Sequence, residues 1–135
     1  MTDAAKAPRE RPLSPHLSVW RAHVTMTTSI LHRIAGGGLY FGALILTGWA
    51  IALASGPEAY ADYKAILGSI PGKLVMLALT LGAFYHLAKG VQHLAWDLGY
   101  GFQPKTATQN SIIVIAFTLA ATLAVWVIAG LTGAL

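Results

Sequence analysis

The chain contains three long stretches without a charged side chain, separated by short polar segments. Residues 34–57, 74–88 and 106–135 carry no Asp, Glu, Lys or Arg. A helix needs about 20 mostly apolar residues to cross the core of a bilayer. The first and third stretches meet this length. The second does so only if His86 and Lys89 are accepted within or near the membrane.

These stretches predict an all-α membrane protein. The segments between them are rich in Gly, Pro and charged residues, which is typical of loops at membrane surfaces. We therefore expect an N-terminal tail, residues 1–28, followed by a single transmembrane domain, residues 29–135. Its three helices are expected at about residues 29–55, 72–98 and 108–133.

Composition favours lipid over water as the solvent of this chain. Its 135 residues are 56% hydrophobic and only 10% charged, whereas a typical soluble domain is about 25% charged. The absence of cysteine from the sequence excludes disulfides and thiolate metal sites. The net charge of +4 is spread over the tail and loops without interleaved aromatic residues, so we do not expect nucleic-acid binding.

The distribution of basic residues predicts how the chain crosses the membrane. Five of the nine Lys and Arg residues lie within the first 33 positions, and the positive-inside rule then puts the N-terminus in the cytoplasm. The tail lacks the apolar core of a signal peptide, and its acidic residues and prolines make a poor mitochondrial presequence. We therefore expect a multi-pass protein of the bacterial inner membrane rather than of the mitochondrial one.

The second expected helix carries a polar stripe. At about 100° per residue, Gly82, Gly90, His93 and Asp97 all lie within about 40° of His86. One interpretation is close helix packing, because glycine lets two backbones approach. Another is a flat cofactor lying against a ligating histidine between two glycines. A third is a path for ions, which polar stripes also line. The spacing leaves these interpretations open.

Depth separates the two histidines of this stripe. At about 1.5 Å per residue, His93 lies about 10 Å closer to the cytoplasm than His86. Neutral imidazole is a good axial ligand for haem iron, but one helix cannot supply both ligands to one haem. We expect His32 of the first helix to be too shallow to face His86, so a partner subunit is the simpler source of the second ligand.

The first helix begins with polar residues. Ser29 and Arg33 are one turn apart and share a face. Arg33 could simply extend to lipid phosphates. Alternatively, Ser29, His32 and Arg33 face His93 and Asp97 and form a pocket for a lipid-soluble carbonyl compound or for the carboxylates of a cofactor.

Three other polar positions receive structural interpretations. Lys89 lies at the edge of the stripe, where we expect it to extend to the surface or to pair with a partner chain. Gln92 is expected to point away and to serve packing. The third helix carries only Thr118 and Thr122 as polar groups between residues 112 and 131, and it is expected to be a scaffold.

Two segments of the chain resemble a known family. Residues 11–17, followed by residues 29–33 and Gly36, are similar to the start of the first helix in the cytochrome b membrane-anchor subunit of succinate dehydrogenase (respiratory complex II). Residues 86–99 resemble the second-helix signature of that family, with two histidines seven residues apart, a glycine between them, and then Asp and Gly. The order, the spacing and the three-span topology also match.

The resemblance implies a cofactor and partners. In this family a flavoprotein subunit with FAD oxidises succinate, and an iron–sulfur subunit passes the electrons to ubiquinone at the membrane. Two small anchor subunits hold haem b between them, so this chain would be half of a haem-binding helical bundle. His86 matches the axial ligand of the haem iron, and the second anchor subunit would supply the other. His32, Arg33 and His93 match positions near the haem propionates.

The resemblance also implies a quinone site. Ser29 and Arg33 match quinone-binding residues, and Asp97 matches a position at the rim of that site. We expect Ser29 to donate a hydrogen bond to a quinone carbonyl and Arg33 to stabilise negative charge that develops there. Asp97 and His93 would help to relay protons. No succinate-oxidising residue is expected in this chain.

Three other functions compete with this interpretation. The chain could be a small haem-free transporter or proton-path subunit, with the polar stripe lining the path. It could be a purely structural anchor whose polar residues bind partner helices. Within the family, it could anchor a fumarate reductase, which runs the same chemistry in reverse with menaquinone.

Overall fold

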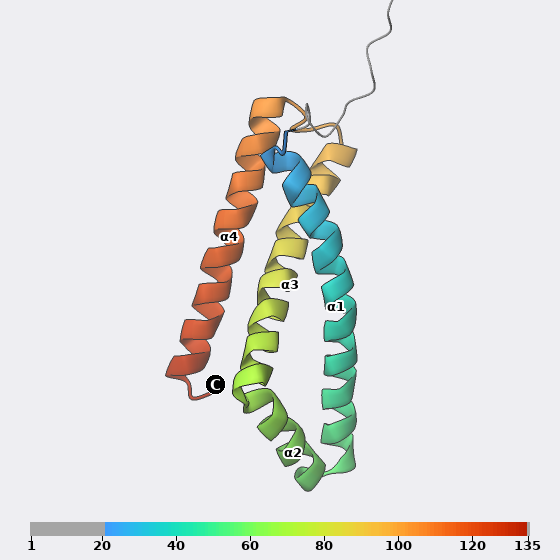
Figure 1. The fold of residues 1–135 in the computed structure, drawn as a ribbon, viewed down its shortest axis with the longest axis vertical. Coiled ribbons are helices and arrows are strands. Elements are labelled where there is room, and N and C mark those ends of the chain that lie inside the picture. Colours follow the sequence, from blue (N-terminus) through green and yellow to red (C-terminus); the bar gives the residue numbers. More distant parts are fainter. Residues whose placement is uncertain (1–20, 135) are drawn as a thin grey trace, which may run out of the picture.

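The computed structural model describes residues 21–134, which form an all-α structure (Figure 1). The all-α prediction is therefore confirmed for these residues. The segment at residues 11–17 that carries part of the family resemblance lies outside them. The helices are α1 (Val24–Ser55), α2 (Pro57–Gly68), α3 (Ile70–Asp97) and α4 (Pro104–Leu131).

Three of these helices, α1, α3 and α4, are long and apolar enough to cross a membrane, as the sequence predicts. They contain 32, 28 and 28 residues, which corresponds to lengths of about 48, 42 and 42 Å. A bilayer core is about 30 Å thick. Each helix therefore exceeds the core by a few turns, which carry the polar ends into the headgroup regions.

The first long helix begins earlier than the sequence predicts, at Val24 rather than at residue 29. The segment from 24 to 28 contains Thr and Val and does not register as an apolar stretch. Tertiary contacts order it, because the Tyr85 hydroxyl of α3 donates a 2.6 Å hydrogen bond to the carbonyl oxygen of Thr28. His32 consequently lies eight residues, or about 12 Å, beyond the start of the helix.

The segment between the first two spans is a helix, so the prediction of a loop there was wrong for α2. Pro57 stands at its start, where the fixed φ of proline suits the first helical turn. Tyr63 donates a 2.6 Å hydrogen bond from its hydroxyl to the carbonyl oxygen of Ile45 in α1. This bond ties α2 to α1 and makes the connection between the spans an ordered element.

The long helices meet most closely at one end, which we call the upper end (Figure 1). There α1 begins, α3 ends and α4 begins, and α4 diverges from α1 towards the lower end. The sharp turn from α3 to α4 uses Gly99 and Gly101 with φ of 87° and 79°, a backbone region that favours glycine. The upper end therefore brings together residues from all three spans.

Buried positions in the described residues are more often polar than apolar. The buried apolar side chains are small or medium-sized, namely Ala52, Ala107 and Val114. The buried polar side chains are Thr28, Lys89, Gln92, Ser111, Thr118 and Thr122. Large apolar side chains cover the outside, which suits a surface that faces lipid and partner helices.

Gly72 generates a prediction about the junction of α2 and α3. A methyl group there would clash with the backbone carbonyl oxygens of Ile66 and Leu67, which cannot move without opening the junction. We expect Gly72→Ala to lower the stability by about 1–3 kcal/mol, measured as a lower thermal midpoint in detergent. Gly68→Ala is the control, because nothing lies within 4 Å of the added methyl group. Equal midpoints for the two variants would contradict the prediction.

Candidate functional site

Three histidines of α1 and α3 form a cluster, which we call the histidine cluster. The rings of His32 and His86 are stacked, with centroids 4.0 Å apart and planes 8° apart. The ring of His93 meets His32 edge-on at 4.8 Å. The expectation that His32 is too shallow to face His86 was therefore wrong. The reason is the early start of α1, which carries His32 deeper into the bundle.

The hydrogen bond of His86 decides which of its ring nitrogens is available. Its Nδ1 lies 3.2 Å from the backbone carbonyl oxygen of His32. A carbonyl can only accept, so Nδ1 carries the proton and Nε2 keeps its lone pair. Among residues 21–134, Nε2 has no hydrogen-bond partner. A histidine whose Nδ1–H is held by a backbone carbonyl presents its Nε2 to a metal in the usual way.

Glycines make room for the histidine cluster. A methyl group added to Gly36 would lie 3.0 Å from Cε1 of His86, and one added to Gly90 would lie 3.9 Å from Nε2 of His32. That Nε2 atom is buried and has no hydrogen-bond partner in the described structure. Gly42, in contrast, contacts Leu79, where an added methyl group would lie 2.9 Å from Cδ2. Gly42 therefore serves helix packing, whereas Gly36 makes space for the His86 imidazole.

The histidine cluster fits a ligand to one external metal centre better than it fits a bare metal ion. The described residues contain no group of three or more His, Cys, Asp or Glu side chains that could hold an ion. One free Nε2 on His86, with glycine beside the ring, suits a flat macrocycle whose iron takes one axial ligand from this chain.

A second polar group lies beside the histidine cluster and centres on Lys89, whose side chain is 0% exposed. Its Nζ donates to Thr28 Oγ1 at 3.0 Å, to Gln92 Oε1 at 2.7 Å and to Ser111 Oγ at 3.3 Å. We call Lys89 and these three residues the lysine cluster. The cluster joins α1, α3 and α4.

The lysine cluster corrects three expectations. Lys89 does not extend to the surface, because hydroxyl and amide groups within the bundle bind its ammonium group. Gln92 does more than pack against a neighbouring helix, since its Nε2 lies 3.3 Å from the carbonyl oxygen of Ala107 and 3.4 Å from Ser111 Oγ in α4. The third span is more than an inert scaffold, because its Ser111 binds Lys89 and Gln92. The sequence signal was the spacing of Lys89 and Gln92, three residues apart on one helix.

The predicted quinone-site residues lie near the upper end on two different helices. Ser29 is half-buried and Arg33 exposed on α1, and Asp97 is the exposed last residue of α3. Within the described residues no hydrogen bond or ion pair joins their side chains. His93 connects the histidine cluster to this end, since its ring lies 5.2 Å from that of Trp96. The three histidines thus lie in contact with one another, whereas Ser29, Arg33 and Asp97 are at least partly exposed.

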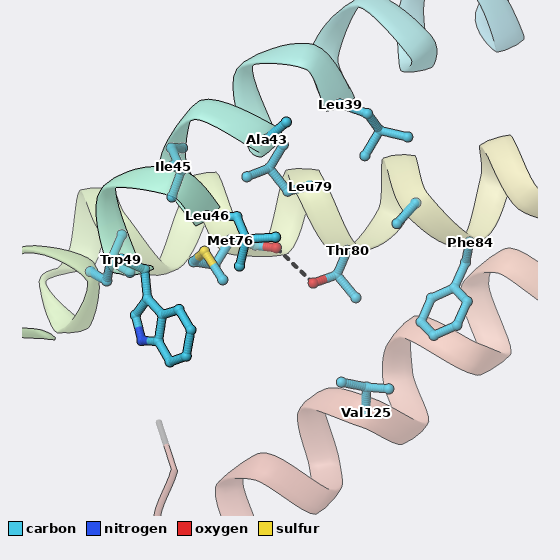
Figure 2. A pocket seen from close by; sticks show the side chains of 13 residues that line it. Leu39, Ala43, Ile45, Leu46, Trp49, Met76, Leu79, Thr80, Phe84 and Val125 are labelled. Carbon is cyan, nitrogen blue, oxygen red and sulfur yellow. Dashed lines mark hydrogen bonds between the residues drawn. The ribbon is translucent and has the colours of Figure 1, made fainter. Parts of the chain in front are cut away.

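The lower half of the bundle carries an apolar groove of about 750 Å³ between α1, α3 and α4. Figure 2 shows that its wall is aliphatic and aromatic, and that the hydroxyl of Thr80 turns back to the carbonyl oxygen of Met76 at 2.7 Å. No titratable side chain lines it. The labelled lining residues are Leu39, Ala43, Ile45, Leu46, Trp49, Met76, Leu79, Thr80, Phe84 and Val125. The groove can bind apolar chains or helices but offers no acid, base or ligand.

Comparison with known proteins shows the family of this chain. A family model for the succinate dehydrogenase/fumarate reductase transmembrane subunit matches residues 7–125. The chain is 36% identical to the succinate dehydrogenase cytochrome b556 subunit of Rickettsia felis over 118 residues, which cover 87% of this chain and 92% of the relative. It is 37% identical to the subunit of the same name from Paracoccus denitrificans over 106 residues, covering 78% and 82%.

A relative from a eukaryote extends the comparison. The chain is 36% identical over 125 residues to the succinate dehydrogenase cytochrome b560 subunit of Reclinomonas americana, which covers 87% of this chain and 85% of the relative. The matches run through all three spans, including α3 with its histidines. The chain therefore belongs to the succinate dehydrogenase/fumarate reductase transmembrane subunit family, as one of the cytochrome b membrane-anchor subunits of succinate dehydrogenase.

Proposed function

We propose that this anchor subunit co-ligates haem b through Nε2 of His86 and forms part of the site at which ubiquinone is reduced. The observation that carries the proposal is the hydrogen bond from His86 Nδ1 to the His32 carbonyl oxygen, which leaves Nε2 free. The names of the relatives, which are cytochrome b subunits, support the choice of haem b. When bound, the haem would supply a one-electron redox centre within the membrane.

The residues of this chain have distinct tasks towards the haem. His86 supplies one axial ligand, and the His32 carbonyl oxygen fixes the tautomer and the ring orientation. Arg33, His32 and His93 would hold the propionates by charge and hydrogen bonding. A second small anchor subunit would supply the other haem ligand, because the ring of His32 is stacked on that of His86.

The quinone site lies at the upper end of the bundle. Ser29 donates a hydrogen bond to one carbonyl oxygen of ubiquinone, and Arg33 stabilises negative charge on that oxygen as electrons arrive. Asp97 and His93 deliver protons from the cytoplasm. The open, partly exposed positions of Ser29, Arg33 and Asp97 support this assignment, because a substrate and partner chains need access to them.

The proposed assembly follows from family membership. The flavoprotein and iron–sulfur subunits, which carry FAD and the iron–sulfur clusters, dock on the cytoplasmic side, and the second anchor subunit packs along the membrane-spanning helices. The apolar groove suits an apolar helix or lipid chain. The N-terminus is cytoplasmic by the positive-inside rule, and a bacterial inner membrane fits the relatives from Rickettsia and Paracoccus.

The competing functions have less support. The family match makes a free-standing transporter or proton-path subunit unnecessary. The free Nε2 of His86 is unexplained by a purely structural anchor. The family model covers fumarate reductase as well, but the relatives compared are named for succinate dehydrogenase.

Replacement of the proposed ligand tests the haem assignment. In purified complex, we expect His86→Leu to abolish or shift the b-type absorption in the reduced-minus-oxidised spectrum, with succinate or dithionite as reductant. His23→Leu is the control, because His23 is exposed and lies just outside α1. A wild-type spectrum from assembled His86→Leu complex would move the ligand to another residue.

The glycine beside His86 offers a test that leaves every histidine in place. Gly36→Val would push the His86 ring out of its position, because even a methyl group would lie 3.0 Å from Cε1. We expect haem affinity to fall by about 10- to 100-fold, the range typical when the support of a metal ligand is disturbed. Gly37→Val is matched in helix and residue type but meets nothing within 4 Å. Equal haem content in both variants would argue against the proposed location.

Arg33 tests the quinone assignment. We expect Arg33→Ala to lower the rate of ubiquinone reduction by about 100-fold, because a preorganised positive charge at the developing anion is lost. Succinate oxidation with a water-soluble dye that accepts electrons before the membrane should be unchanged. Lys64→Ala, an exposed residue of α2 at the lower end, is the control. Normal ubiquinone reduction by assembled Arg33→Ala complex would remove Arg33 from the site.

A further inference from the structure

The lysine cluster is built to hold a cation. An ammonium group has three N–H donors and no acceptor, and Lys89 has three acceptors within 3.3 Å, on Thr28, Gln92 and Ser111. Its Nζ also lies 4.9 Å from the centre of the Trp96 ring, a position in which the face of the indole attracts a positive charge. Three hydrogen-bond acceptors and one indole ring thus lie around the ammonium group.

The charge of Lys89 is not neutralised by an acidic neighbour among residues 21–134. Their carboxylates are those of Glu58 and Asp62 in α2 and Asp97 at the end of α3. Asp97 is eight residues further along the same helix, or about 12 Å along its axis. Because Lys89 is also 0% exposed, neither water nor salt screens its field effectively. The positive charge therefore acts on its surroundings over a longer range than a surface lysine would.

Hydrogen bonds fix this charge relative to the histidine cluster. Lys89 lies one helical turn after His86. The hydroxyl of Thr28 accepts a hydrogen bond from Lys89, and the carbonyl oxygen of Thr28 accepts one from the Tyr85 hydroxyl. One turn later on α1, the carbonyl oxygen of His32 accepts a hydrogen bond from His86. The segment from 85 to 89 is thus bound at three points to the segment from 28 to 32. The ammonium group and the His86 ring are therefore held by the same short segment of α1.

We propose that Lys89 raises the reduction potential of the haem that His86 ligates. This inference rests on the proposed function of His86. Reduction adds one negative charge to the haem, and a fixed positive charge nearby lowers the free energy of the reduced form relative to the oxidised form. Burial and the charges around a cofactor are among the means by which a protein sets such potentials. Lys89 would be an electrostatic positioning residue and would not itself touch a reacting atom.

Lys89→Met tests the proposal in the intact, haem-loaded complex. Methionine approximates the length of lysine without its charge, and Thr28, Gln92 and Ser111 can still bind one another, since their polar atoms lie 3.4 Å apart in pairs. We expect the haem midpoint potential, measured by spectroelectrochemical titration, to fall. At the wild-type midpoint the ratio of reduced to oxidised haem should drop about tenfold, which corresponds to 59 mV for a one-electron couple.

Two further variants separate the charge from the structural role of the cluster. Gln92→Glu keeps an oxygen acceptor for Lys89, but its carboxylate neutralises the positive charge of Lys89. The haem midpoint potential should therefore fall in this variant as well. Ser111→Ala removes the three hydrogen bonds that Ser111 Oγ accepts from Thr28, Lys89 and Gln92 but keeps the charge of Lys89, so the potential should stay at the wild-type value. If Lys89→Met does not assemble, Gln92→Glu decides the matter.

The outcomes are distinguishable from failure of the haem assignment. Wild-type potentials in haem-loaded Lys89→Met and Gln92→Glu complexes would overturn the electrostatic role of Lys89 and leave His86 as the ligand. An equal fall in Ser111→Ala would also overturn it, because loss of structure alone would then explain the shift. An unaltered haem spectrum in His86→Leu complex would instead overturn the proposed function.

Discussion

The binding of one buried ammonium group by three neighbouring side chains is the interaction on which the bundle depends. In lipid the hydrophobic effect does not hold helices together, so packing and hydrogen bonds between helices must do so. Lys89 draws Thr28 of α1 and Ser111 of α4 to α3, with Gln92 beside it. The buried residues of the described chain are accordingly more often polar than apolar, the reverse of a soluble domain.

The same contact brings the functional residues together. Where α1 meets α3, Tyr85 and Lys89 bind Thr28, and the next turn of α1 places the carbonyl of His32 at His86. Gly36 then leaves space for the His86 imidazole, because an added methyl group would lie 3.0 Å from its Cε1. The lower half, with its apolar groove, holds no such chemistry. The division of the chain into a polar upper part and an apolar lower part is thus a direct result of where the helices are joined.

The sequence predicted what depends on a single helix and missed what depends on two. Hydropathy located the three spans, and helical periodicity put His86 and His93 on one face with glycine. The depth of His32 was misjudged, because the start of α1 is ordered by Tyr85, 57 residues away from its partner Thr28. The roles of Lys89 and Gln92 were missed because Ser111 and Thr28 come from other helices. The turn formers after α1 concealed α2, since Pro57 begins a helix as readily as it ends one.

The position of Ser111 on the last span has a consequence for biogenesis. The ribosome delivers α3 to the membrane before α4, because N-terminal segments emerge first. A lysine within a span is costly to insert into the bilayer. Until α4 arrives, that charge can be stabilised by Thr28, by Gln92 and by the face of the Trp96 ring. The last span thus supplies the final hydrogen-bond acceptor for an ammonium group that is already in the bilayer. Truncation before Ser111 would leave this group without that acceptor, and quality-control proteases could recognise the incomplete protein.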